Sequence, residues 1–159
     1  MVYYPRSPAL STGHPEMWDR EPANLEAAVR GSLMNPPPKL WIARLVPRGL
    51  SGWLARRLRR GGKAVTCQVR TVSSVIEAHD VERLDLLKID CEGAELDVLH
   101  GIREAHWPRI QQVVMEVHDE DGRLDEAKGI LARAGFTHLV VDVEPGFEET
   151  PLRNIFARR

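Results

Sequence analysis

The chain has 159 residues, of which 43% are hydrophobic and 28% are charged, and its formal net charge is −1. This is the composition of a soluble globular domain, and no apolar run approaches the about 20 residues that a membrane-spanning helix requires. Residues 1–63 carry 11 Lys and Arg against 4 Asp and Glu, whereas residues 64–159 carry 11 against 19. We expect these opposite charges to offset each other within the protein, and we therefore expect no nucleic-acid and no membrane partner.

The first five residues contain no basic region followed by an apolar one, so no secretion signal is recognisable. The only cysteines are Cys67 and Cys91, and both fall on predicted strands. We therefore expect a cytoplasmic protein whose two thiols are reduced and lie in the core.

Residues 1–62 have little regular pattern. A short strand is predicted at residues 2–4, and apolar residues at helical spacing predict a helix over residues 24–33, with Asn24 as its cap. Residues 39–60 form a basic, amphipathic segment that proline and glycine divide into two short helical pieces. We interpret residues 1–62 as an irregular, helical, insertion-like region that packs its apolar face on the rest of the domain. Binding of this segment to a membrane surface is the alternative.

After Gly62 the pattern becomes regular and alternates between strand and helix periods. The predicted strands are residues 64–69, 84–89, 111–117, 137–143 and 154–157, and the predicted helices are residues 71–79, 94–102 and 122–134. This alternation predicts an α/β fold for residues 63–159. Residues 84–89 place apolar side chains on both faces of the predicted strand, which is typical of a parallel strand that is covered on both faces.

Acidic residues follow two neighbouring strands of this predicted sheet. Asp90 and Glu92 come directly after one strand, and Glu116 and His118 lie at the end of the next. Because ligands bind beyond the carboxyl ends of strands in open α/β sheets, we expect these four side chains to share one crevice. Lys88 lies on the same strand face as Asp90, and we expect Glu92 or Glu116 to pair with it, since an unpaired buried ammonium is costly.

These residue types support acid–base chemistry. Asp90 or Glu116 is a candidate base or hydrogen-bond acceptor, His118 is a candidate proton carrier, and a divalent cation between the carboxylates is a further interpretation. The structural alternative is that Glu92 merely opens the following helix, where negative charge is favourable, and that His118 is a surface residue. Both alternatives stay open on the sequence alone.

The string Leu-Leu-Lys-Ile-Asp-Cys-Glu-Gly-Ala-Glu-Leu-x-Val-Leu-x-Gly at residues 86–101 resembles the signature of the FkbM-type methyltransferases. In that family the block follows the fourth strand and a Glu-x-His tip follows the fifth, which is similar to residues 116–118 here. Residues 3–8 and 154–158 also resemble segments of family members. The resemblance implies S-adenosylmethionine-dependent O-methylation of a small natural product or sugar hydroxyl. It also implies a Rossmann-like, doubly wound, mostly parallel sheet.

By matched position, the resemblance implies that Asp90 lies near the methionine end of the cofactor and near the acceptor. Glu92, Glu116 and His118 are implied to line the acceptor side. The family's glycine-rich turn after the first strand, and the acid after the second strand that binds the ribose, have no counterpart in this sequence. We therefore expect residues 63–159 to form the C-terminal half of a methyltransferase domain without its N-terminal strands, as in a truncated or partial member.

Such a half-domain is expected to bind S-adenosylmethionine weakly or not at all on its own. Its exposed sheet edge would favour self-association or pairing with a complementary chain. Two alternatives are a non-catalytic binding or regulatory half-domain, and a metal-dependent hydrolase with Asp90, Glu92, Glu116 and His118 as ligands of Mg²⁺ or Mn²⁺. The sequence does not identify the methyl acceptor.

Overall fold

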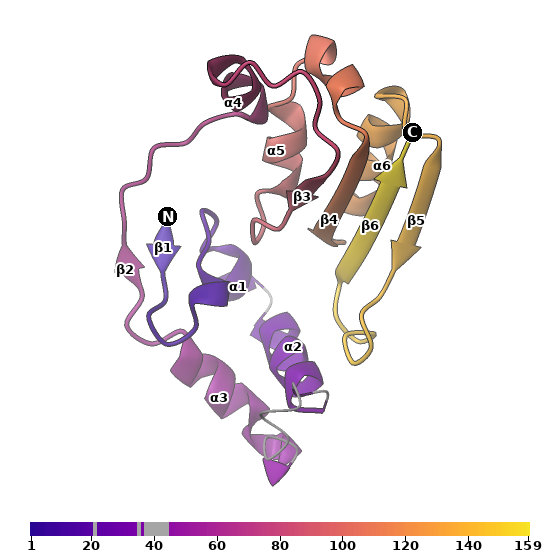
Figure 1. Ribbon diagram of the computed structural model, residues 1–159. Helices are drawn as coiled ribbons and strands as arrows, with labels where there is room; N and C mark the ends of the chain where they lie inside the picture. The colour runs from indigo at the N-terminus through magenta and orange to yellow at the C-terminus, as the bar shows by residue number, and fades with distance from the viewer. Residues whose placement is uncertain (21, 35, 37–44) are drawn as a thin grey trace. The chain divides into compact units, whose positions relative to one another are not determined.

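The computed structural model describes residues 1–20, 22–34, 36 and 45–159. The chain forms two compact units, which are described separately (Figure 1). The amino-terminal unit contains Met1–Thr66 and Val143–Pro151, and the sheet unit contains Cys67–Asp142 and Leu152–Arg159. The division into an insertion-like region at residues 1–62 and a methyltransferase half-domain at residues 63–159 stays a prediction.

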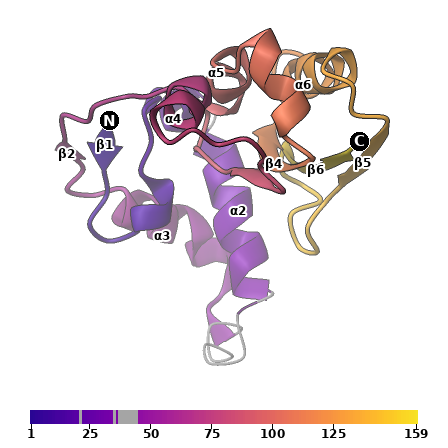
Figure 2. The same ribbon diagram turned by 45° about the horizontal axis from the view of Figure 1, so that its top comes forward.

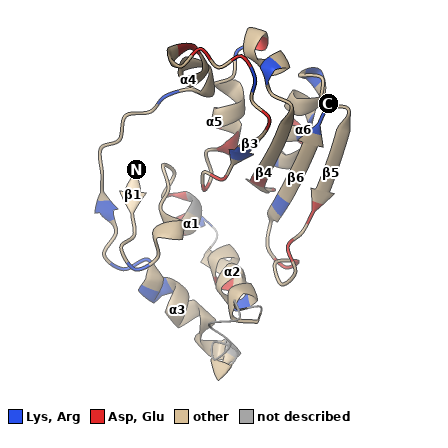
Figure 3. Ribbon diagram, in the orientation of Figure 1, with Lys and Arg blue, Asp and Glu red and all other residues tan. Residues whose placement is uncertain are grey.

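The amino-terminal unit contains a small antiparallel sheet and three helices. Strand β1 (Val2–Tyr3) pairs with β2 (Lys63–Ala64). The helices are α1 (Met17–Arg20), α2 (Pro22–Met34) and α3 (Ser51–Leu58), and two 3-10 helices are η1 (Pro8–Leu10) and η3 (Arg48–Leu50). Figure 3 shows Lys and Arg on α3 and at β2. The buried residues that form the core of this unit are Tyr4, Trp18, Leu25, Val29 and Ala55.

The predicted strand at residues 2–4 and the helix at residues 24–33 are confirmed, with α2 extending one to two residues beyond each predicted end. The predicted strand over residues 64–69 is wrong beyond Ala64. Residues 65–70 are exposed and lie outside the strands of the structure, and Val69 is 90% exposed. A valine-rich pattern alone did not distinguish a strand from an extended connection. Of the two predicted helical pieces in residues 39–60, the first falls largely on residues 37–44, which lie outside the described residues.

The sheet unit contains four strands in the order β3-β4-β6-β5. The strands are β3 (Leu87–Ile89), β4 (Gln112–His118), β5 (His138–Asp142) and β6 (Leu152–Arg158). The helices are α4 (Val72–Ala78), α5 (Glu95–His100), η4 (Glu104–Arg109) and α6 (Arg123–Arg133). The predicted α/β class is confirmed, and every element predicted between residues 71 and 157 is present, with shifted ends.

The strand pairings differ from those of a mostly parallel sheet. Strands β3 and β4 are parallel, whereas β6 is antiparallel to both β4 and β5. It follows that β3, β4 and β5 share one direction, and that β6 enters the sheet between β4 and β5 in the opposite direction. Two of the three pairings are therefore antiparallel, because the last strand is inserted between two strands that would otherwise be neighbours.

One face of the sheet forms the main core. Alternate residues of β4, Val113, Met115 and Val117, are at most 1% exposed, and they pack with Leu99 of α5 and Leu131 of α6. Figure 2 shows α5 and α6 together beside the strands. Trp107 and Phe136 close this core in an edge-to-face contact with ring centroids 6.1 Å apart. Full burial of each large apolar side chain contributes about 1.5–3 kcal/mol, so this face supplies most of the stability of the unit.

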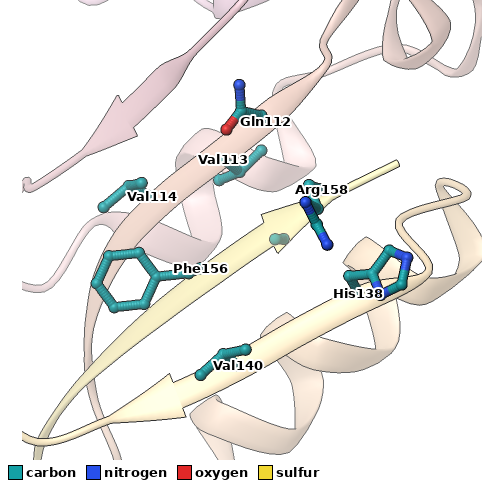
Figure 4. Close-up of a pocket in the computed structure, with 8 residues that line it drawn as sticks. Gln112, Val113, Val114, His138, Val140, Phe156 and Arg158 are labelled. Carbon is teal, nitrogen blue, oxygen red and sulfur yellow. The ribbon is translucent and has the colours of Figure 1, made fainter.

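The opposite face of the sheet is largely open in the sheet unit. Val114, Phe156 and Val140 are aligned across β4, β6 and β5, and Val140 is 60% exposed. Figure 4 shows these residues around a shallow depression of about 330 Å³. The prediction that residues 84–89 are covered on both faces is wrong, since Leu86 and Lys88 are exposed. The helices that pack on the strands in this unit do so on the other face.

Both cysteines are exposed, and neither forms a disulfide. The prediction of core thiols is therefore wrong for both. Cys67 belongs to the exposed connection that was predicted to be a strand, and Cys91 lies just beyond the end of β3. Among the described residues, the structure contains no helix with the length and apolar character needed to cross a bilayer.

Candidate functional site

The acidic residues of the predicted crevice lie together at the carboxyl ends of β3 and β4. Ile89 pairs with Met115 in the parallel register, and Asp90 and Glu116 are the next residue on each strand. Each of Asp90, Glu92 and Glu116 has a carboxylate oxygen within 4.8 Å of the other two. We call these three residues the acid cluster. Figure 3 shows the acidic segment that follows β3.

Lys88 is bound to one member of the acid cluster. Its Nζ donates a hydrogen bond to the Asp90 carboxylate. This hydrogen bond raises the pKa of Lys88, and the negative charges of Asp90 and Glu116 act in the same direction. Glu92 and Glu116 were the predicted partners, but the partner that the structure shows is Asp90. Side chains two residues apart project from the same face of an extended strand, which explains this contact.

Glu92 has the most perturbed environment of the cluster. Burial, together with the negative charges of Glu116, Asp90 and Glu95, raises the pKa of Glu92 to about 7. Its backbone is left-handed, with φ of 46°, and Gly93 follows with φ of 98°. A left-handed conformation costs a non-glycine residue about 1–2 kcal/mol. Because its pKa is about 7, the Glu92 carboxyl group exchanges its proton near neutral pH.

The alternative that Glu92 only opens a helix does not fit the backbone. Helix α5 begins at Glu95, with Ala94 as its N-cap, so Glu95 holds the first helical position. Glu92 and Gly93 instead form the turn between β3 and that helix.

His118 lies on the same face of β4 as Glu116 and is half-buried. Burial lowers the pKa of His118, against the opposite effect of the negative charges of Glu95, Glu120 and Asp90. The imidazole is therefore neutral at neutral pH. His118 is not one of the three residues whose ligand atoms lie within 4.8 Å of one another, so it flanks the acid cluster.

Three convergent carboxylates are suited to Mg²⁺ or Mn²⁺ by their chemistry. Asp90 is already bound by the Lys88 ammonium, and acidic groups of this exposure gather commonly without an ion. We therefore assign no metal to the acid cluster.

Two further residues hold this site, and the sequence interpretation gave neither of them a role. Glu95 is 1% exposed and accepts a hydrogen bond from the Gly93 N–H. Arg123, the first residue of α6, donates to the Gly93 carbonyl oxygen. Glu95 belongs to the motif at residues 86–101, which was a usable signal. Arg123 lies 30 residues from Gly93, and no local pattern connects them.

In open α/β sheets, ligands bind in the crevice beyond the carboxyl ends of the strands, and the acid cluster lies at this position. The comparison with known families is more specific. The sequence profile described as the Methyltransferase FkbM domain matches residues 43–145, and the chain belongs to this family.

Several characterised proteins are similar in sequence. The chain is 33% identical over 159 residues to the 31-O-demethyl-FK506 methyltransferase FkbM of Streptomyces tacrolimicus, and the match covers 100% of the chain and 56% of that protein. It is 42% identical over 85 residues, 50% of the chain, to the AMB antimetabolite synthetase AmbE of Pseudomonas aeruginosa, of which the match covers 4%. It is 41% identical over 73 residues, 45% of the chain, to Methyltransferase 1 of Beauveria bassiana, of which the match covers 29%.

The chain thus spans about half the length of the first of these relatives, and smaller shares of the others. No solved structure matches the chain significantly.

Proposed function

We propose that this chain is part of an S-adenosylmethionine-dependent methyltransferase of secondary metabolism that acts in the cytoplasm. In this proposal the sheet unit is the C-terminal half of a Rossmann-like domain, and the acid cluster faces the methyl acceptor. The single observation that supports it most is the convergence of Asp90, Glu92 and Glu116 at the ends of two parallel strands, in a chain of the FkbM family.

The charge of the cluster fits one end of the cofactor. S-adenosylmethionine carries a positive sulfonium and a positive ammonium group at its methionine end. The three carboxylates of the acid cluster, beside a single lysine, provide a negative electrostatic potential that favours these two groups. The glycine-rich strand–turn–helix that usually contacts the nucleotide part of a cofactor is not recognisable in this sequence. We therefore assign only the methionine end and the acceptor to residues of this chain.

The proposed chemistry is a proton transfer coupled to methyl transfer. When bound, S-adenosylmethionine would supply the methyl group that passes to the acceptor oxygen, with S-adenosylhomocysteine as the leaving group. A base that removes the proton of the acceptor hydroxyl contributes typically about 10²–10⁴-fold to the rate. Glu92 suits this role, because its pKa of about 7 lies near neutral pH.

The other members of the site have supporting roles in this proposal. Asp90 and Glu116 accept hydrogen bonds from the acceptor and maintain the negative field that raises the pKa of Glu92. His118, neutral at neutral pH, relays the proton toward solvent.

The acceptor is proposed to be a hydroxyl group of a small natural product or sugar. The Streptomyces tacrolimicus relative is named as a 31-O-demethyl-FK506 methyltransferase, and the Pseudomonas aeruginosa relative is named as an antimetabolite synthetase. Both names support this acceptor class.

The proposal is tested by titrating the purified chain with S-adenosylmethionine that is labelled with ¹³C at its methyl group. Binding at the acid cluster is expected to be weak and to broaden or shift the methyl resonance, and S-adenosylhomocysteine is expected to reverse the change. Glu92→Gln with Glu116→Gln should weaken binding about fivefold, equivalent to about 1 kcal/mol. Glu104→Gln, which removes an exposed charge at η4, is the matched control and should leave binding unchanged. A methyl resonance that stays unperturbed at saturating protein would refute the assignment of the methionine end of the cofactor to the acid cluster.

Self-association is a second part of the proposal. Strand β3 is at one edge of the described sheet, and Leu86 next to it is 52% exposed. Exposed edge strands favour pairing with another chain. Sedimentation velocity over a range of concentrations should reveal dimers that Leu86→Lys abolishes, and a monomer at every concentration would exclude this association.

A further inference from the structure

Both hydrogen-bonding groups of the Gly93 peptide units are held by charged side chains. The Gly93 N–H donates to Oε1 of Glu95 over 2.7 Å, and the Gly93 carbonyl oxygen accepts from Nη2 of Arg123 over 2.8 Å. The same Nη2 lies 3.4 Å from the other carboxylate oxygen of Glu95. We call Glu95, Arg123 and the Gly93 backbone the glycine clamp.

The burial of Glu95 is not explained by stability alone. Its side chain is 1% exposed, and a buried charge is costly unless it is paired and hydrogen-bonded. Arg123 and the Gly93 N–H supply these interactions, but a buried ion pair is often no more stabilising than apolar residues of the same volume. The placement of the carboxylate against a single glycine backbone points to a role in shaping that turn.

The turn needs such support because it contains two consecutive left-handed residues. Glu92 has φ of 46° and Gly93 has φ of 98°, and a non-glycine residue keeps a left-handed conformation only where its surroundings impose it. Asp90 and Glu92 are both in this turn, directly beyond β3. The conformation of the turn therefore decides whether the Glu92 carboxylate meets Asp90 and Glu116.

The clamp also joins the two strand ends that form the site. Glu95 begins α5, which follows β3, and Arg123 begins α6, which follows β4 (Figure 1). Their contacts with Gly93 link the turn after β3 to the first residue of the helix after β4. A substitution of Glu95 or Arg123 is therefore expected to affect both the residues that follow β3 and the end of β4, which together form the acid cluster.

We propose that Glu95 and Arg123 are positioning residues that hold the Gly93 peptide from both sides and so present Glu92 to Asp90 and Glu116. The assignment rests on the proposed function only in that the acid cluster is the part of the site that they position. The contacts of Glu95 and Arg123 with the Gly93 backbone are present in the protein without any ligand.

The test is the amide hydrogen exchange of Gly93, measured by NMR on ¹⁵N-labelled full-length chain without a methyl donor. Glu95→Ala removes the acceptor and should raise the exchange rate of Gly93 about tenfold or more, because local opening becomes easier. Glu95→Gln keeps an oxygen acceptor of nearly the same shape and should restore exchange to within about threefold of the wild type. Asp97→Asn is the matched control, since it removes a charge from the first turn of the same helix on its exposed side, and it should leave Gly93 unchanged.

Arg123 has its own readout and control. Arg123→Met should move the Gly93 carbonyl ¹³C resonance upfield, because the carbonyl loses a charged donor, whereas Arg133→Met at the other end of α6 should not move it. Gly93 exchange that is equally slow in folded Glu95→Ala, or a carbonyl resonance that Arg123→Met leaves unmoved, overturns the proposal. If Glu95→Ala does not fold, the other two variants decide. Fast Gly93 amide exchange in Arg123→Met together with slow exchange in Glu95→Gln supports the clamp. Gly93 amide exchange that is unchanged in both variants overturns it.

Titration with methyl-labelled S-adenosylmethionine separates this proposal from the proposed function. If the wild-type chain binds no methyl donor, the assignment of the cofactor's methionine end to the acid cluster fails, while the exchange experiment still decides the clamp. If the wild-type chain binds and the folded Arg123→Met variant binds equally well, the proposed function stands and the positioning role is overturned.

Discussion

Gly31 lies directly against the carbonyl oxygen of Gly146. A Cβ atom placed on Gly31 would be 2.2 Å from that oxygen and 3.0 Å from the carbonyl carbon, far inside any allowed contact. Helix α2 can therefore approach the loop at residues 143–151 only because residue 31 has no side chain. The contact joins two segments of the amino-terminal unit that are more than a hundred residues apart in sequence.

We predict that Gly31→Ala destabilises the protein although alanine is the better helix former. The intrinsic preference for alanine in a helix is about 1 kcal/mol, but the clash with backbone atoms forces α2 and the loop apart, at a cost of about 1–3 kcal/mol. Gly129→Ala in α6 is the matched control. Its added Cβ meets only the mobile end of Arg133, at 3.2 Å, so this variant should be stabilised by up to about 1 kcal/mol. Urea unfolding followed by circular dichroism measures both, and equal effects of the two variants would contradict the contact.

The two faces of the sheet should respond differently to the same substitution. Val113→Thr buries a hydroxyl in the main core, where Val113 is 0% exposed, and should cost about 1–3 kcal/mol. Val140→Thr changes a side chain that is 60% exposed on the open face and should alter the free energy of unfolding by less than about 0.5 kcal/mol. Both substitutions keep a branched Cβ, so strand propensity changes little in either case. A large loss of stability in Val140→Thr would mean that the open face is covered in solution.

Much of the sheet unit could be predicted because its signals are local. The alternation of Val113, Met115 and Val117 identifies β4, and two glycines, Gly122 and Gly135, bound α6. The acids could be placed at one edge for the same reason, since two consecutive strands joined by a helix tend to be parallel neighbours. That inference needed only the ends of β3 and β4.

The incorrect predictions concern pairings that depend on distant residues. The position of β6 between β4 and β5 depends on its hydrogen bonds to both of these strands, and no feature within residues 152–158 specifies it. The exposure of residues 65–70 likewise depends on which segments lie beside them rather than on their composition. The contact of Arg123 with Gly93 joins the first residue of α6 to the turn after β3 and has no sequence signature.

The exposure of both cysteines predicts that two thiols react with a thiol reagent in the folded protein. Burial of part of the side chain raises the pKa of Cys91, and the negative charges of Glu95 and Asp90 add to this effect. In a Cys67→Ser variant the remaining thiol should therefore react slowly at neutral pH, and its rate should rise about tenfold per pH unit up to that pKa. Stopped-flow labelling without denaturant tests this, and a thiol that reacts only after unfolding would contradict it.

The raised pKa of Glu92 predicts a stability that declines as the pH rises. In the folded protein Glu92 keeps its proton up to a pKa of about 7, whereas the unfolded chain releases it near the ordinary glutamate pKa of 4.5. Between these values the folded state binds more protons than the unfolded state, so the free energy of unfolding falls as the pH increases through this window. The full loss, at most about 3 kcal/mol, is reached above the folded pKa. His118, whose pKa is lowered, has the opposite effect, because its contribution falls as the pH drops below 6.5.

Glu92→Gln separates the two contributions. Its neutral side chain keeps the volume of glutamate, so the variant should be more stable than the wild type above the folded pKa of Glu92, and the difference should vanish as the pH approaches 4.5. Glu104→Gln removes a fully solvated charge from the same unit and should show no such pH-dependent difference. Urea unfolding at a series of pH values measures each difference. Parallel stability curves for Glu92→Gln and the wild type would mean that Glu92 does not share a partly buried site with Asp90 and Glu116.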